Sequence, residues 1–125
     1  MKVLVTGGAG FIGSYVNKIL LDQGHQVTVI DDLSKGHKES LNPKANFHQV
    51  SLEDQKQLEE ILAGHDAVIH MASFIEVGES VKKPVEFAQN NIVGTVKLLE
   101  SMKNSNVKKI IFSSSACVYG VPKKL

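Results

Sequence analysis

Short apolar runs alternate with helix-like spacings along the whole 125-residue chain. Five runs indicate strands, at 3–5, 27–30, 47–50, 67–69 and 107–112. Three segments have helical spacing, at 12–20, 51–62 and 84–103, and they follow the first, third and fourth strands. Strands that are joined through helices form right-handed crossovers in a parallel sheet. Because the strands lack alternating polar residues, we expect a sheet that is buried on both faces. The pattern predicts an α/β, doubly wound parallel sheet with strand order 3-2-1-4-5.

The composition fits one globular domain over residues 1–125. Hydrophobic residues make up 42% of the chain and charged residues 22%, an ordinary globular balance. The formal net charge is +1 and all 14 basic residues are lysines, so the chain lacks the basic surplus of a nucleic-acid binder. No apolar run approaches the roughly 18 residues of a membrane span. We therefore expect neither a nucleic-acid nor a membrane partner.

Cysteine and histidine usage favours a reducing compartment over a metal site. Cys117 is the only cysteine, so no disulfide forms within the chain. The five histidines are scattered, and no pair has the spacing of a known metal motif. The first residues run directly into glycines without the apolar core of a secretory signal. We expect a cytoplasmic protein with no bound metal.

The segment Thr6–Gly13 is a glycine-rich turn between the first predicted strand and the first predicted helix. Its glycines fit two overlapping frames, Gly8-x-Gly10-x-x-Gly13 and Gly7-x-x-Gly10-x-x-Gly13. In either frame one glycine permits a tight turn, one lets the backbone approach a pyrophosphate, and one lets helix and strand pack closely. The first N–H groups of the helix then face the phosphates. Because of its position between strand and helix, the motif predicts a Rossmann-like dinucleotide site rather than a plain glycine-rich turn.

The acidic end of the second predicted strand indicates which dinucleotide binds. Asp31 stands 18 residues after Gly13, where a carboxylate accepts the hydroxyls of the adenosine ribose. Asp31 and Asp32 together would repel a 2′-phosphate, and the chain has no arginine to bind one. This favours NAD over NADP, although Lys35 is a basic residue that could pair with a 2′-phosphate. Asp32 could equally be a solvated loop acid.

Five segments have the order and spacing of a known family: Thr6–Gly13, His70–Ser73, Val77–Ser80, Asn90-Asn91 and Ser113–Gly120. Through them the whole chain resembles the N-terminal part of the extended short-chain dehydrogenases/reductases, and among these the UDP-glucose 4-epimerases. The glycine motif is common to that superfamily, and the later segments are more specific. Family members normally exceed twice this length. The resemblance therefore implies an incomplete sheet, with further strands and a substrate domain outside residues 1–125.

The resemblance also implies a set of cofactor contacts. The backbone of Phe11 and Ile12 would meet the NAD pyrophosphate, residues 31–35 would line the adenosine ribose, and residues 71–73 would pass beneath the cofactor. Ser51 and Leu52 would adjoin the adenine, and Asn90 would anchor the cofactor from the long helix. The predicted cofactor-binding residues are Gly7, Gly10, Phe11, Ile12, Gly13, Asp31, Asp32, Leu33, Ser34, Lys35, Ser51, Leu52, Met71, Ala72, Ser73, Asn90 and Ser113.

Two of the quoted positions have structural alternatives. The family usually carries an acid at position 51. Ser51 could accept the adenine amino group, and it could also serve as a helix N-cap, with Asp54 three residues later, a role compatible with the first. For His70 we expect a structural hydrogen bond at the end of its strand rather than a part in the chemistry.

The resemblance implies epimerisation at C4 of a UDP-hexose. Ser115 would bond the sugar hydroxyl, and a Tyr-x-x-x-Lys pair later in family members supplies the base, while hydride passes to NAD and returns to the other face of the sugar. Strand parity supports Ser115, since Ser113 and Ser115 share one face at the carboxyl end of a strand. Three serines could also simply cap a strand end.

A formal Tyr-x-x-x-Lys occurs at Tyr119–Lys123, but we reject it as the catalytic pair. That chemistry needs both side chains on one face of a helix, and Gly120 and Pro122 would break the turn between them. We therefore predict that residues 1–125 by themselves bind the cofactor without catalysing turnover.

The predicted helix over 84–103 carries two apolar stripes. The first comprises Val85, Ala88, Ile92, Val96, Leu99 and Met102, and the second Phe87, Gly94 and Leu98. We expect the first stripe to face the sheet and the second to pack against a partner, either another helix of a longer chain or a second copy in a homodimer. The apolar strand at Ile110–Phe112 would be an exposed edge.

Two other functions fit part of the pattern. A nucleotide-sugar 4,6-dehydratase would need an acidic pair after the active-site hydroxyl, where this chain has Ala116 and Cys117. A non-catalytic NAD-binding sensor agrees with the lack of a usable Tyr-x-x-x-Lys pair and disagrees with the presence of Ser115.

Overall fold

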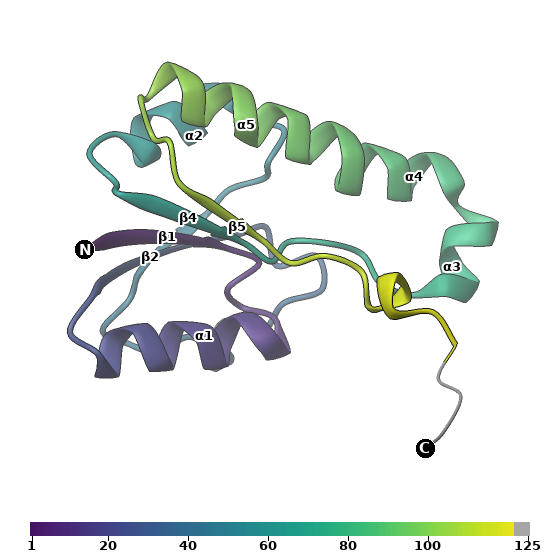
Figure 1. The fold of residues 1–125 in the computed structure, drawn as a ribbon, viewed down its shortest axis with the longest axis horizontal. Coiled ribbons are helices and arrows are strands. Elements are labelled where there is room, and N and C mark those ends of the chain that lie inside the picture. The colour runs from purple at the N-terminus through teal and green to yellow at the C-terminus, as the bar shows by residue number, and fades with distance from the viewer. Residues whose placement is uncertain (122–125) are drawn as a thin grey trace.

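A computed structural model describes residues 1–121 and has a five-stranded parallel sheet at its centre (Figure 1). The strands are β1 (Lys2–Thr6), β2 (Gln26–Asp31), β3 (Asn46–Gln49), β4 (Ala67–His70) and β5 (Ile110–Phe112). Their order in the sheet is β3-β2-β1-β4-β5, and every neighbouring pair is parallel. The predicted fold class and strand order are confirmed.

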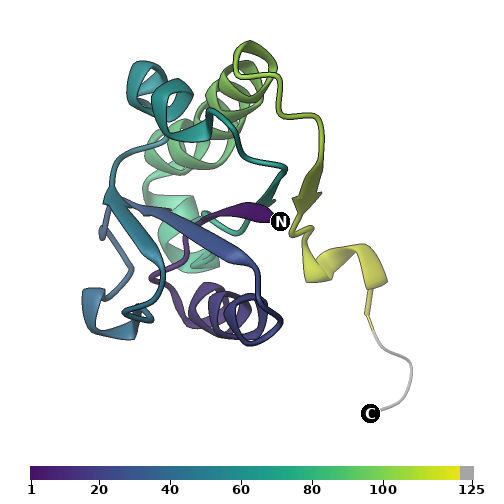
Figure 2. The same ribbon diagram turned by 90° about the vertical axis from the view of Figure 1, so that its left-hand side faces the viewer.

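Helices cover both faces of the sheet (Figure 2). Helix α1 (Phe11–Asp22) lies on one face, and α2 (Gln55–Leu62) and α5 (Gly94–Asn104) lie on the other. The shorter elements are α3 (Val77–Lys82), α4 (Pro84–Ala88), η1 (Lys38–Ser40), η2 (Gln89–Val93) and η3 (Ala116–Tyr119). No helix within residues 1–121 has both the length and the apolar character that a membrane crossing requires.

Strand parity divides the apolar residues between two cores. Val3 and Val5 of β1 pack with Val27 and Val29 of β2 on the α1 face. Leu4, Ile30 and Val68 point to the opposite face, where they meet residues of α2 and α5 that are fully buried, namely Leu58, Leu62 and Leu98. A sheet buried on both faces explains why its inner strands show no polar alternation.

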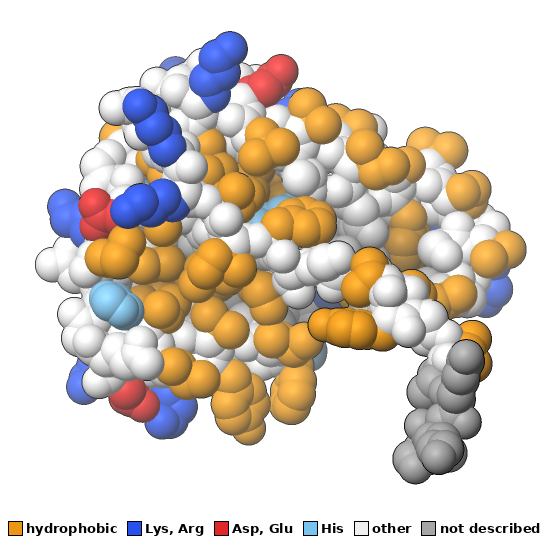
Figure 3. All heavy atoms as spheres, viewed as in Figure 1, with side chains coloured by type: hydrophobic (Ala, Val, Ile, Leu, Met, Phe, Trp, Pro, Cys, Tyr) orange, Lys and Arg blue, Asp and Glu red, His pale blue; other side chains and the backbone are white. Residues whose placement is uncertain are grey.

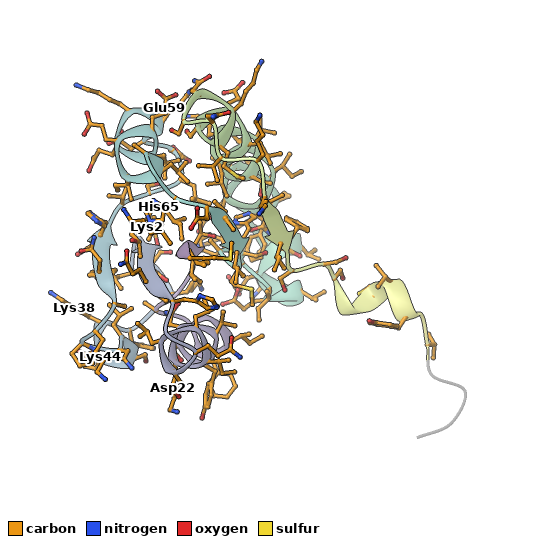
Figure 4. The ribbon with its side chains drawn as sticks, turned by 60° about the vertical axis from the view of Figure 1, so that its left-hand side comes forward. Lys2, Asp22, Lys38, Lys44, Glu59 and His65 are labelled. Atoms are coloured by element: carbon orange, nitrogen blue, oxygen red, sulfur yellow. The ribbon has the colours of Figure 1, made fainter. Side chains whose placement is uncertain are left out.

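Helices α2 and α5 are also joined by polar contacts. Glu59 lies on α2 next to the end of α5 (Figure 4), and its Oε1 accepts a hydrogen bond of 2.6 Å from Nδ2 of Asn104. The hydroxyl of Ser105 donates to the Glu59 carbonyl at 3.1 Å. These contacts fix α5 against α2, which itself packs on the sheet.

The start of α2 differs from the predicted cap. Asp54 is the N-cap, and its Oδ1 accepts a hydrogen bond of 3.1 Å from the backbone N–H of Gln57. The hydroxyl of Ser51 instead accepts from the N–H of Glu53 at 3.2 Å, in the turn before the helix. The prediction of Ser51 as the helix cap was wrong, because both residues favour caps and only the path of the chain decides between them.

The long helix is continuous but not uniform. The π-helical segment η2 interrupts it between α4 and α5, so side chains before and after it do not share one regular face. Leu98 and Met102 are buried against α2 and the sheet, whereas Val85, Ile92, Val96 and Leu99 are exposed. The first stripe was predicted to face the sheet, which is correct for Met102 and wrong for Val85, Ala88, Ile92, Val96 and Leu99. Leu98, predicted to face an outside partner, is buried in the core, whereas the predicted role of Phe87 stays a prediction. Apolar side chains are visible along α4 and α5 on the outer surface (Figure 3).

Candidate dinucleotide-binding site

Three of the four glycines in the loop between β1 and α1 have no room for a side chain. A Cβ on Gly7, whose φ is +68°, would lie 2.6 Å from the backbone nitrogen of Ala72. A Cβ on Gly13 would lie 2.3 Å from the Gly7 carbonyl oxygen, and one on Gly8 would lie 2.6 Å from Val29. Gly10 is different, because a Cβ there would meet nothing closer than the Gly7 carbonyl oxygen at 3.3 Å. Three glycines are thus required for packing, and Gly10 keeps the cleft side of the loop open.

The amino end of α1 opens at this loop. Gly10 is the N-cap, so no side chain caps the helix within the described residues. The hydrogen bond between the N–H of Ser14 and the Gly10 carbonyl, at 2.9 Å, belongs to the first helical turn. The preceding N–H groups, those of Phe11, Ile12 and Gly13, have no partner earlier in the helix. Such a helix start attracts a phosphate through its N–H groups and its dipole.

Asp31 connects the loop to the end of β2. This residue is buried, and its Oδ2 accepts a hydrogen bond of 2.9 Å from the N–H of Ala9, while Oδ1 accepts one of 2.9 Å from the N–H of Leu33. Each carboxylate oxygen can still accept one more hydrogen bond. Gly36 packs directly against this carboxylate, since a Cβ on Gly36 would lie 2.8 Å from Oδ1. The carboxylate is therefore held in place and keeps free acceptor positions.

His70 links the ends of two neighbouring strands. Its Nδ1 lies 2.6 Å from the hydroxyl of Thr6, its register partner in β1, and its Nε2 lies 2.9 Å from the hydroxyl of Thr95 in α5. Thr95 donates to the Asn91 carbonyl at 2.7 Å, so it accepts from Nε2. Nδ1 is then the acceptor and Thr6 the donor. The expected structural hydrogen bond of His70 is confirmed.

This arrangement requires a neutral imidazole. Burial lowers the pKa of His70 from 6.5 to about 4, so the ring is uncharged at neutral pH. The oxygen of Thr6 remains free to accept from the N–H groups of Met71 and Ala72, both at 3.3 Å. His70 and Thr6 thereby fix the backbone that follows β4, next to the glycine loop.

Asn91 holds the next part of the same segment. Its Oδ1 accepts from the N–H of Phe74 at 2.8 Å, and its Nδ2 donates to the Phe74 carbonyl at 2.9 Å. Asn90 donates to Asn91 Oδ1 at 2.8 Å. Both asparagines lie in the π-helical segment, a type of irregularity that is frequent at functional sites.

These elements surround one cleft at the carboxyl ends of β1, β2 and β4. The structure brings together most of the predicted cofactor residues along it: Gly7, Gly10, Asp31, Asp32, Ser34, Lys35, Leu52, Met71, Ala72, Ser73 and Asn90. Four lining residues were not predicted, namely Ile30, Gly36, Val50 and Phe74. Phe74 directly follows the predicted run 71–73, so extending that run by one residue would have included it.

The remaining predicted residues lie outside this lining. Phe11 and Ile12 are exposed at the start of α1, and Gly13 is buried behind the loop. Leu33 donates its N–H to Asp31. Ser51 is exposed in the turn before α2. The role of Ser51 at the adenine stays a prediction, whereas its neighbour Leu52 lines the cleft.

The serines after β5 are exposed. The N–H of Ser113 donates to the His70 carbonyl at 3.2 Å, and the hydroxyl of Ser115 accepts from the N–H of Cys117 at 3.1 Å as the N-cap of η3. Tyr119 is 90% exposed at the end of η3, where Gly120 has a φ of +69°. Lys123, the other half of the rejected pair, lies outside the described residues.

No cluster of three or more His, Cys, Asp or Glu side chains in the described part of the chain could hold a metal ion.

Comparisons with known proteins identify the family of this chain. A profile of the "NAD dependent epimerase/dehydratase family" matches residues 3–125. A UDP-glucose 4-epimerase of Lactobacillus helveticus is 48% identical over all of this chain and 38% of that protein. The crystal structure of a UDP-glucose 4-epimerase from Stenotrophomonas maltophila with bound NAD and formylated UDP-arabinopyranose is 37% identical, with a TM-score of 0.92 over 99% of this chain and 40% of that one.

A second structural relative has higher identity. The UDP-glucose 4-epimerase of Thermotoga maritima, solved with UDP-glucose, is 44% identical, with a TM-score of 0.90 over 100% of this chain and 41% of that one. The chain thus spans about two fifths of the length of these relatives. Because the family profile covers residues 3–125, the chain belongs to the NAD-dependent epimerase/dehydratase family.

Proposed function

We propose that residues 1–125 are the NAD-binding domain of a nucleotide-sugar 4-epimerase that interconverts UDP-glucose and UDP-galactose. The observation that carries this proposal is the cleft itself, in which an uncapped helix start and the carboxylate of Asp31 face the same space. Relatives that are UDP-glucose 4-epimerases support the choice of sugar nucleotide. The lone Cys117 agrees with a reducing cytoplasm.

The residues of the cleft fit an adenine dinucleotide. Gly10 leaves space against the loop, and the N–H groups of Phe11 and Ile12 would bind the pyrophosphate. The remaining acceptor positions of Asp31 would take the ribose hydroxyls, and the apolar Val50 and Leu52 would contact the adenine. When bound, NAD supplies the hydride acceptor and donor for the reaction.

Ser115 would contribute on the substrate side. Its hydroxyl is exposed and accepts one hydrogen bond, from Cys117, so its proton is available to a sugar oxygen. The reaction also needs a base that removes the proton of the sugar hydroxyl. The tyrosines of the described residues, Tyr15 and Tyr119, are 59% and 90% exposed and do not line the cleft. This supports the expectation that the 125-residue chain binds NAD without turning over UDP-galactose.

Calorimetric titration with NAD tests the proposal. The unmodified chain should bind NAD, and Gly10→Ala should weaken binding by roughly tenfold or more, since the added methyl group occupies the space of the pyrophosphate. Gly78→Ala is the matched control, because a Cβ there would meet nothing within 4 Å and it lies in α3. If NAD does not bind the unmodified chain, the proposal fails. Conversion of UDP-galactose above a no-enzyme control would contradict the expected inactivity.

We also propose that the protein is a homodimer. Four apolar residues on α4, η2 and α5 are exposed, namely Val85, Ile92, Val96 and Leu99, and we call them the outer stripe. A two-fold pairing of helices would cover these side chains with the same residues of the partner. A second copy of the chain is the partner that this proposal names.

A further inference from the structure

An ion pair joins the two sides of the cleft. Lys35, in the loop after β2, places its Nζ 3.0 Å from Oε1 of Glu76, in the loop after β4. The same ammonium group lies 5.7 Å from the ring centroid of Phe74. Because β1 stands between β2 and β4 in the sheet, the pair bridges the two loops that flank the glycine loop.

The charges around the cleft bear on whether it accepts the 2′-phosphate of NADP. Asp31 and Asp32 are the acids that line the cleft, and Lys35 is the only basic residue lining it among residues 1–121. NADP differs from NAD by a 2′-phosphate, a group that carries close to two negative charges at neutral pH. Dinucleotide folds accept this phosphate through a basic side chain near the end of the second strand. Lys35 is the one residue in that position here.

Glu76 neutralises the charge of Lys35 from the opposite side of the cleft. The hydrogen bond from Lys35 lowers the pKa of Glu76, so the carboxylate stays charged and paired at neutral pH. The ammonium group is also attracted to the face of the Phe74 ring. Asn91 fixes the backbone of Phe74 through two hydrogen bonds, so the position of this ring depends on the fold.

We propose that Glu76 is a specificity-determining residue that holds Lys35 away from the ribose 2′ position and so makes the cleft select NAD over NADP. The inference rests on the proposed function, since it requires the cleft to bind a dinucleotide. The two side chains are 56% and 43% exposed, so the pair is weak and its loss changes selectivity by several-fold rather than completely.

The test is Glu76→Gln, with calorimetric titration of NAD and NADP at low ionic strength. This variant keeps the shape of the side chain and removes its charge, which releases Lys35 and makes the cleft less negative. NADP binding should tighten by roughly three- to tenfold, and NAD binding should change by less than about twofold. The gain should shrink in about 0.5 M NaCl, because salt screens exposed charges.

Two further variants complete the test. Glu79→Gln is the matched control, because Glu79 is 44% exposed and pairs at 3.0 Å with Lys82 on α3, outside the cleft lining. It should leave the ratio of the two affinities unchanged. The double variant Lys35→Gln/Glu76→Gln should lose the gain in NADP binding, since the gain depends on the released ammonium group.

The outcomes separate this inference from the proposed function. If Glu76→Gln and Glu79→Gln give the same affinity ratio, or if the double variant keeps the gain, Glu76 does not act through Lys35 and the inference is overturned. NAD binding to the unmodified chain reports on the proposed function independently. If the unmodified chain binds neither dinucleotide, the proposed function fails, and this inference with it.

Discussion

At the level of single residues, His70 determines how the segment after β4 is held. A neutral ring accepts from Thr6 and donates to Thr95, and these residues lie in β1 and α5. A protonated ring would present N–H groups to both hydroxyls and would break the order of donors and acceptors. Removing a buried partner from such a network costs more than its net hydrogen-bond energy.

This residue predicts a pH dependence of stability. The folded pKa of about 4 lies below the usual 6.5, so the unfolded chain binds the proton first as the pH falls. Stability should be unaffected by His70 above pH 6.5 and should decrease from there toward pH 4, by roughly 3 kcal/mol at most. Urea unfolding at a series of pH values measures this slope.

His70→Asn should flatten that slope, whatever its effect on stability at neutral pH. Burial also lowers the pKa of His65, which adds a slope of the same sign, so the variant reduces the pH dependence without abolishing it. His37→Asn, at an exposed position, is the control and should keep the unmodified profile. An unchanged slope in His70→Asn would falsify the assignment of a buried neutral ring.

At the level of elements, α5 shows two neighbouring leucines in opposite environments. Leu98 is fully buried with Leu58 and Leu62 of α2, whereas Leu99 is 46% exposed on the outer stripe. Successive helical residues point about 100° apart, so Leu98 and Leu99 face different directions, and in this packing only Leu98 faces α2.

This contrast predicts unequal costs of truncation. Leu98→Ala should destabilise the chain by roughly 2–5 kcal/mol, because it opens a cavity between α5 and α2. Leu99→Ala removes the same atoms from a partly exposed position and should cost less than about 1 kcal/mol. Urea unfolding at neutral pH measures both. Equal losses would mean that α5 does not present the face described above.

At the level of the whole molecule, apolar surface remains on the α5 side and at the β5 edge of the sheet. Besides the outer stripe, Ile111 and Phe112 of β5 are 63% and 57% exposed. β5 is an edge strand, paired on one side with β4. An exposed apolar edge is a template for association. The outer stripe and this edge are therefore two surfaces through which the chain could associate.

The proposed homodimer predicts where a charge will disrupt association. Val96→Lys, in the outer stripe, should shift the chain toward monomer, because pairing would bury an unpaired ammonium group. Ile19→Lys is the control, since Ile19 is 54% exposed on α1, on the other face of the sheet. Sedimentation analysis over a range of concentrations measures the effect. A monomeric unmodified chain, or equal dissociation by both variants, would contradict the proposed interface.

The sequence by itself determined the order of elements and the location of the site. Apolar runs and helical spacings predicted the five strands and their parallel order, and the glycines of 7–13 marked the loop, because backbone conformation and side-chain period are local properties. Asp31 was predicted from its distance to that loop. The turn at Gly120, whose φ is +69°, also follows from the residue itself.

Tertiary structure decided the features that depend on distant residues. The partners of His70, the contact of Asn91 with Phe74 and the pairing of Lys35 with Glu76 all join segments that are far apart or on different elements. The choice of Asp54 over Ser51 as a cap and of Leu98 over Leu99 as the buried residue was ambiguous locally. In each case two residues satisfy the same local rule, and only the packing of the helix on the sheet distinguishes them.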